Sequence, residues 1–132
     1  MSNLEVAARF LVASEARDVS SLEELIAEDV VWDMSRSRGP YSGVYRGHDE
    51  VRNLLEGVID AWESMRFERV ATYEVGDLLA EQVEVTMKGQ GSGVEIVAEG
   101  ARVYEFHDGR IARFTMFQDM DDAKAFVDAA QP

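Results

Sequence analysis

The stretch ARVYEFHDGRIARFTMFQ, residues 101–118, decides the fold of this chain. At its centre, Asp108-Gly109 is the strongest short signal for a two-residue β-hairpin turn, because both residue types tolerate positive φ angles. The residues on either side are rich in β-branched and aromatic side chains, which favour strands. We therefore expect two long antiparallel strands, residues 94–107 and 110–118, joined by a tight turn.

The segments before this hairpin extend the sheet. Residues 67–75 and 78–88 are expected to be strands, and in the second of them Val83, Val85 and Met87 alternate with polar residues, as in a half-buried strand. A short β-branched and aromatic run at residues 30–34 predicts a further strand. Strands that follow one another through short turns form an antiparallel sheet, and such a sheet needs helices on one face.

Helical periodicity occupies the rest of the chain. Apolar residues recur at intervals of three and four, most clearly from Val51 to Trp62. Capping residues and turn residues mark where each helix begins. The expected starts are Ser2, Ser20 or Ser21, Gly47, and Asp119 or Asp121. Helices followed by long strands and a final helix indicate an α+β domain.

Composition limits the partners of this domain. The 132 residues carry 13 Lys and Arg against 26 Asp and Glu, a formal net charge of −13, and contain no Cys. Nucleic acid and anionic membranes repel such a charge, so we expect no nucleic-acid partner and no membrane partner. With no disulfide framework and no signal peptide or membrane-spanning stretch, we expect a cytoplasmic protein.

Four short motifs carry a family resemblance. They are Asp29-Val30-Val31-Trp32, Tyr45-Arg46-Gly47, Gly91-Ser92-Gly93 and Phe106-His107-Asp108-Gly109-Arg110-Ile111. In this order and spacing the sequence resembles the nuclear transport factor 2-like superfamily, and within it the polyketide-cyclase-like (SnoaL-like) branch. The resemblance implies a single domain over residues 1–132. It also implies a cone-shaped, strongly curved, mostly antiparallel sheet wrapped around about three N-terminal helices, with a short C-terminal helix. A largely apolar pocket and a homodimer formed through the sheet face are further implications.

The hairpin turn predicts which side chains share a face of the sheet. If His107 pairs with Arg110, Val103 lies opposite Phe114 and Glu99 lies opposite Gln118. Similar proteins line their pocket with alternate residues of the last strand. The expected ligand-binding residues are Trp32, Tyr41, Tyr45, Trp62, Met87, Val103, Phe114 and Met116. Arg102 and Arg113 are then expected on the outer face, and a slip of one residue would reverse this assignment.

Few polar side chains remain for chemistry. Glu99 with Gln118 could act as a general base and a positioning amide at the pocket mouth, or could form an exposed cross-strand pair. Asp33 could act as a base in the pocket, or could be the outward residue of an alternating strand. The resemblance places the oxyanion-stabilising acid of the steroid isomerases near Ala101 or Val103 and their general base at or beside Met34, with Asp33 one residue away. It places the carboxylates of the epoxide hydrolases where Phe114 and Met116 stand, so neither catalytic set is intact.

Two further features bear on ligand chemistry. Arg36, Arg38 and Arg46 lie in a stretch without carboxylates, which could receive a ligand anion or could neutralise acidic neighbours. With two His and no close cluster of His and carboxylates, we expect no metal site and no cofactor. The sequence therefore predicts a pocket for a small hydrophobic or carbonyl-bearing metabolite, either in a cofactor-free acid/base isomerase, cyclase or dehydratase, or in a non-catalytic ligand-binding or dimerisation domain.

Overall fold

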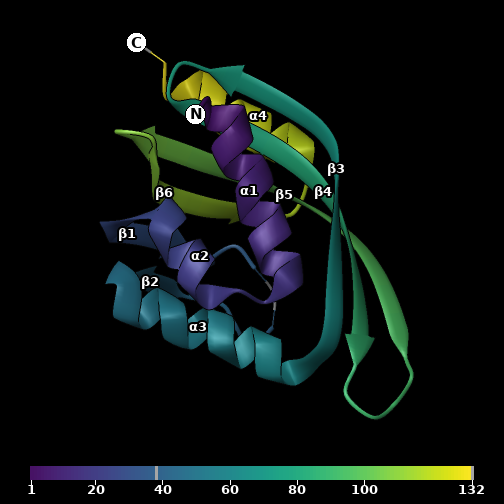
Figure 1. Cartoon of the computed structure of the whole chain (residues 1–132). Helices are drawn as coiled ribbons and strands as arrows, with labels where there is room; N and C mark the ends of the chain where they lie inside the picture. The colour runs from purple at the N-terminus through teal and green to yellow at the C-terminus, as the bar shows by residue number, and fades with distance from the viewer. Residues whose placement is uncertain (38, 132) are drawn as a thin grey trace.

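The expected hairpin forms the centre of a six-stranded curved sheet in the computed structural model, which describes residues 1–37 and 39–131 (Figure 1). The strands are β1 (Ile26–Asp33), β2 (Val44–Arg46), β3 (Trp62–Val75), β4 (Leu78–Gly89), β5 (Glu95–His107) and β6 (Arg110–Phe117). Their spatial order is β2-β1-β6-β5-β4-β3, with β1 parallel to β6 and all other neighbours antiparallel. The sheet is therefore mixed, and the α+β class is confirmed.

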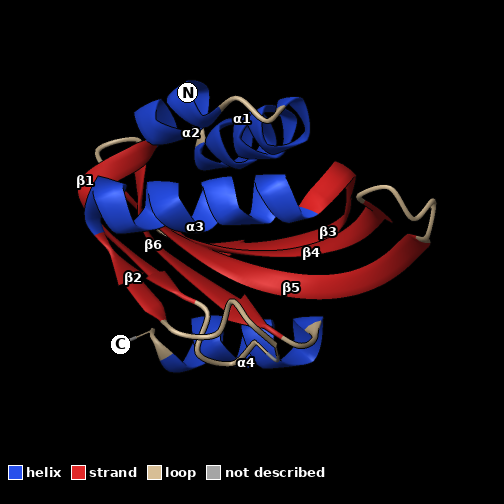
Figure 2. Cartoon of the chain, turned by 90° about the horizontal axis from the view of Figure 1, so that it is seen from below, coloured by secondary structure: helices blue, strands red, loops and turns tan. Residues whose placement is uncertain are grey.

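Helices cover both faces of the sheet. They are α1 (Asn3–Ala16), α2 (Val19–Leu25), α3 (Gly47–Ala61) and α4 (Met120–Ala129). The first three lie together on the concave face, and α4 lies alone on the opposite face (Figure 2). In the described part of the chain, no helix combines the length and apolar character that crossing a membrane requires.

Side chains at the helix starts explain where three helices begin. The Ser2 side chain accepts a hydrogen bond from the Glu5 amide, as expected for the first helix. The second helix is capped by Asp18 and not by Ser20 or Ser21, because the Asp18 carboxylate accepts hydrogen bonds from both the amide and the hydroxyl of Ser21. A carboxylate that accepts two bonds is a strong N-terminal cap. Asp119 caps the last helix.

Beyond the turn, the pairing of β5 with β6 differs from the expected register. Asp108 and Gly109 have φ angles of 52° and 77°, as a tight hairpin turn requires, and His107 pairs with Arg110. The register then shifts between Phe106 and Glu105, and Ala112 has no partner in the ladder. This bulge offsets every later pair by one residue. As a result Phe114 lies opposite Tyr104, and not opposite Val103.

The bulge decides which side chains lie under which helices. Arg102 and Tyr104 share the concave face with Phe114, beneath α1, α2 and α3. Val103 and Phe117 lie on the opposite face, where they pack with Ala123 and Val127 of α4. The expectation that Arg102 lies on the outer face is therefore wrong. The expectation that Val103 shares the face of Phe114 is wrong for the same reason.

Candidate functional site: an apolar cavity containing a buried arginine

A cavity of about 450 Å³ lies between the helices and the concave face of the sheet. Its lining residues are mostly aliphatic, aromatic and Met side chains: Phe10, Ser14, Leu22, Trp32, Met34, Pro40, Tyr41, Leu54, Leu55, Val58, Ile59, Ala61, Trp62, Met65, Phe67, Met87, Arg102, Phe114 and Met116. Ligand sites in proteins commonly measure roughly 300–1,000 Å³ and combine apolar walls with a few polar groups. The size and the lining both match this description.

Stacked aromatic rings form one wall of the cavity. The Trp32 and Phe114 rings lie 4.0 Å apart between centroids and are inclined by 11°. Phe10 of α1 packs against Trp32 at 5.4 Å. Because β1 and β6 are parallel neighbours that pair Trp32 with Phe114, the strand register itself produces the stack. This wall offers flat, rigid apolar surface to a planar or ring-containing molecule.

Polar groups in the lining are sparse. The Ser14 hydroxyl donates a hydrogen bond to the Phe10 carbonyl oxygen. Arg102 is the charged residue among the described residues that line the cavity, and Asp, Glu and His are absent from that set. The cavity therefore presents hydrogen-bond donors without a carboxylate or imidazole base.

Arg102 is buried to an unusual degree for an arginine. Only 5% of its surface is exposed, and its Nε atom is buried without a hydrogen-bond partner. Its guanidinium carbon lies 5.2 Å from the Phe114 ring centroid and 5.9 Å from the Phe67 ring centroid. Buried polar groups nearly always have partners, so an unpaired guanidinium nitrogen calls for an explanation.

A buried polar cluster lies beside Arg102 on the same face of the sheet. Glu81 is fully buried; its carboxylate accepts a hydrogen bond from Arg69 Nε at 2.8 Å and one from the Tyr104 hydroxyl at 2.8 Å. Burial raises the pKa of Tyr104 well above its ordinary value, and the nearby Glu81 carboxylate raises it further, although the positive charge of Arg102 opposes this shift. Tyr104 is therefore a neutral donor that holds Glu81 in place.

Sequence reasoning missed the buried roles of Arg102 and Glu81. Glu81 lies on the same side of β4 as Leu79 and Val83, two residues before and after it. Its place among apolar side chains was a usable sequence signal for burial. No comparable signal marked Arg102, because its face depends on the bulge at Ala112.

The structure brings most of the predicted ligand-binding residues together. Six of them line the cavity: Trp32, Tyr41, Trp62, Met87, Phe114 and Met116. Tyr45 packs against the same core, and its hydroxyl donates to the Tyr41 carbonyl oxygen, but it is outside the cavity lining. Val103 lies on the opposite face of the sheet.

The predicted catalytic residues do not meet in the cavity. Glu99 is exposed and lies opposite Glu84 of β4, while the pairing of β5 with β6 ends at Ala101 and Phe117. Gln118 is exposed, and its side-chain amide donates to the Arg36 carbonyl oxygen. The expected pairing of Glu99 with Gln118 is therefore wrong, whereas a catalytic role for either residue stays a prediction.

Asp33 lies on the outer face of β1 in a polar cluster. Its carboxylate accepts hydrogen bonds from the Ser35 amide and hydroxyl and from Arg113 Nη2, and Arg36 lies 3.8 Å away. Burial alone would raise the pKa of Asp33, but the hydrogen bonds from Ser35 and the charges of Arg113 and Arg36 outweigh it and lower the pKa. An ionised Asp33 on the outer face of the sheet fits a structural role better than the role of a general base in the cavity.

The Asp33→Asn variant tests this structural role. Because the folded-state pKa of Asp33 is lowered, its ionised form stabilises the protein above the unfolded-state pKa, about 3.9, and this stability is lost as pH falls through the folded-state pKa. Urea unfolding should show the variant about 0.5–1.5 kcal/mol less stable at neutral pH. The difference should shrink toward zero in acid. The exposed Asp29→Asn change on the same strand is the control, and a pH-independent difference would contradict the assignment.

The acid-free arginine stretch does not lie over the cavity as one group. Arg36 stacks on Phe117 at 4.9 Å, on the α4 side of the sheet. Arg46 is exposed on β2. Arg38 lies outside the described residues. Neither Arg36 nor Arg46 lines the cavity.

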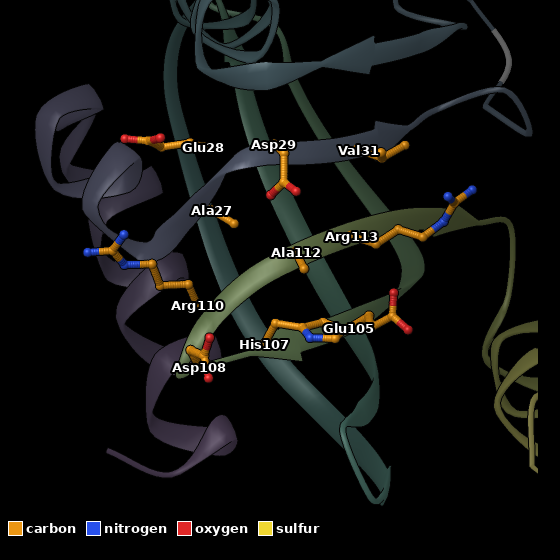
Figure 3. Close-up of a pocket in the computed structure, with 10 residues that line it drawn as sticks. All are labelled: Ala27, Glu28, Asp29, Val31, Glu105, His107, Asp108, Arg110, Ala112 and Arg113. Carbon is orange, nitrogen blue, oxygen red and sulfur yellow. The ribbon is translucent and has the colours of Figure 1, made fainter.

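A second depression, of about 710 Å³, lies over β1, β5 and β6 and is polar (Figure 3). It is lined by Ala27, Glu28, Asp29, Val31, Glu105, His107, Asp108, Arg110, Ala112 and Arg113. The charged side chains point in several directions and do not converge on a common centre (Figure 3). Over the described residues, no group of three or more His, Cys, Asp or Glu could hold a metal ion. The apolar cavity that contains Arg102 is the better candidate site.

A model of the SnoaL-like domain family matches residues 7–114. The chain belongs to the SnoaL-like domain family. Comparison with curated proteins found no match. The match confirms the expected superfamily. All described lining residues of the cavity except Met116 lie within the matched range.

Solved structures share the fold at low sequence identity. An NTF2-like protein of unknown function from Burkholderia pseudomallei has a TM-score of 0.79 and 24% identity, with 92% of this chain and 95% of that chain covered. TerC co-crystallised with polyporic acid has a TM-score of 0.77 and 17% identity, with 96% and 98% covered. RV0760c from Mycobacterium tuberculosis in complex with estradiol-17beta-hemisuccinate has a TM-score of 0.77 and 18% identity, with 89% and 94% covered. These likenesses show the fold that the SnoaL-like domain shares with them.

Proposed function

We propose that this SnoaL-like domain binds a small, largely apolar, ring-containing molecule in the cavity beneath α1, α2 and α3. The observation that carries the proposal is the cavity of about 450 Å³, walled by Trp32 stacked on Phe114. Two proteins of the same fold were crystallised with small organic molecules, polyporic acid and estradiol-17beta-hemisuccinate, which supports a small-molecule ligand for this chain. A binding role needs no base, and the described lining supplies none.

A panel of ring compounds tests the proposal. Naphthalene, phenanthrene and androstane, each bearing a ketone, a carboxamide or a carboxylate, should be screened by thermal shift and then by titration calorimetry. We expect at least one scaffold to raise the melting temperature and to bind with a micromolar dissociation constant, because burial of apolar rings drives association. Failure of all nine compounds to bind would overturn the proposal.

Filling the cavity with a larger side chain should block binding. Val58 of α3 lines the cavity, and the Val58→Trp change adds an indole ring to that space. We expect the affinity for the tightest panel compound to fall by about tenfold or more. Val12→Trp is the matched control on α1, because Val12 is 68% exposed and lies outside the cavity lining. Unchanged affinity in a folded Val58→Trp protein would show that the compound binds outside this cavity. The polar depression of Figure 3 would then be the alternative site.

The catalytic alternative is a cofactor-free acid/base reaction in the same cavity. Its support is Arg102, because a buried guanidinium can stabilise an enolate oxygen that develops during proton transfer. Turnover of a ketone in the panel, detected as solvent deuterium incorporated next to the carbonyl, would establish this alternative. The homodimer expected through the sheet face stays a prediction, which sedimentation equilibrium would test.

A further inference from the structure

The charge of Arg102 has no counterpart in the cavity, and we infer that the ligand carries a carboxylate that pairs with this guanidinium. The inference rests on the proposed function, because it names the chemical class of the ligand in the same cavity. Arg102 is the charged group among the described lining residues, and it lies on the floor formed by the sheet.

The charges around the cavity do not balance. Glu81 is paired with Arg69, and this ion pair accounts for the single buried carboxylate of the cluster. Arg102 takes part in none of the ion pairs that the described residues form. Two arginines thus share one carboxylate, and one positive charge is left over next to apolar walls. Glu81 lies opposite Arg102 in the β4–β5 ladder but forms its ion pair with Arg69, so the positive charge of Arg102 is only partly compensated. Incompletely compensated buried charge is costly to desolvate, and an anion that enters the cavity gains from neutralising it.

The geometry around Arg102 suits an oxygen anion better than a neutral ligand. The rings of Phe114 and Phe67 flank the guanidinium at 5.2 Å and 5.9 Å and offer it only their π faces. The Nε atom still lacks an acceptor. A carboxylate accepts two parallel hydrogen bonds from a guanidinium, which a ring face cannot do. The same rings contact the apolar body of the ligand, so one molecule can satisfy both kinds of group.

Matched ligand pairs separate charge from shape. The carboxylate and the carboxamide of naphthalene, phenanthrene and androstane should be titrated at pH 7 into the wild-type protein, Arg102→Met, Arg102→Lys and Arg66→Met. For the wild type we expect the carboxylate to bind about tenfold or more tightly than its carboxamide. Arg102→Met should abolish this preference, so that the carboxylate and the carboxamide bind this variant with affinities within about threefold of each other. Arg102→Lys should retain part of it, and Arg66→Met, at an exposed residue of β3, should retain all of it.

Each outcome decides between the inference and the proposed function. Equal affinity for carboxylate and carboxamide in the wild type would overturn the inference and leave the proposed apolar site intact. A carboxylate preference that survives in Arg102→Met would place the anion elsewhere and would also overturn the inference. Absence of binding by every compound would overturn both. Circular dichroism of each variant confirms that a lost preference reflects the guanidinium and not unfolding.

Discussion

Replacing Glu81 with alanine should lower the free energy of unfolding by about 3–5 kcal/mol, enough to unfold much of the protein at moderate temperature. Glu81 is the fully buried carboxylate that accepts hydrogen bonds from Arg69 and Tyr104. Without it the Tyr104 hydroxyl is buried with no acceptor. Arg69 also loses its ion-pair partner, and Arg102 loses the carboxylate that lies opposite it in the β4–β5 ladder. Uncompensated buried charge is among the largest single causes of destabilisation.

Urea denaturation of matched variants measures this effect. Glu84→Ala is the control on the same strand, because Glu84 lies opposite Glu99 and its removal relieves a like-charge pair. We expect Glu84→Ala to change stability by less than about 0.5 kcal/mol. Glu81→Gln should cost less than Glu81→Ala, because an amide oxygen still accepts from Tyr104. Equal stability of Glu81→Ala and Glu84→Ala would show that the buried cluster does not hold the sheet together.

Local sequence signals predicted most of the elements of this fold. Asp108-Gly109 predicted the hairpin because the turn needs two residues at positive φ, and both adopt it. Ser2 predicted the start of α1 because the side chain of a cap acts only three residues away. Such features depend on residues close in sequence, so the sequence contains the information needed to place them.

The site was predicted less well because it depends on pairing over long distances. One unpaired residue, Ala112, moved Arg102 from the expected outer face to the cavity and moved Val103 the other way. A bulge leaves no reliable mark in the sequence, yet it reverses every side chain beyond it. Phe114 and Met116 nevertheless lie in the cavity lining, and their role in binding a ligand stays a prediction. They belong to the last strand, β6, and the family resemblance implied which of its side chains face the cavity. That implication did not depend on how β5 pairs with β6.

Replacing Arg102 with methionine should make the ligand-free protein more stable, by about 1–2 kcal/mol. Methionine has an unbranched chain that can fill the space of the arginine stem. It also removes a buried charge that forms no ion pair among the described residues. Apolar replacements of buried ionic groups are often neutral or stabilising. The stacking of Arg102 on Phe114 opposes this gain, because a cation–π contact contributes roughly 0.5–2 kcal/mol.

Calorimetric melting of the unliganded variants measures the balance between these effects. For a domain of this size, about 1–2 kcal/mol corresponds to a rise in melting temperature of several degrees. Arg66→Met, at an exposed position of β3, should change the melting temperature by only a degree or two. A loss of more than about 1 kcal/mol in Arg102→Met would show that the fold itself uses the charge. A gain would show that the free protein retains a destabilising cation on the floor of its cavity, the arrangement expected when the missing partner is an anionic ligand.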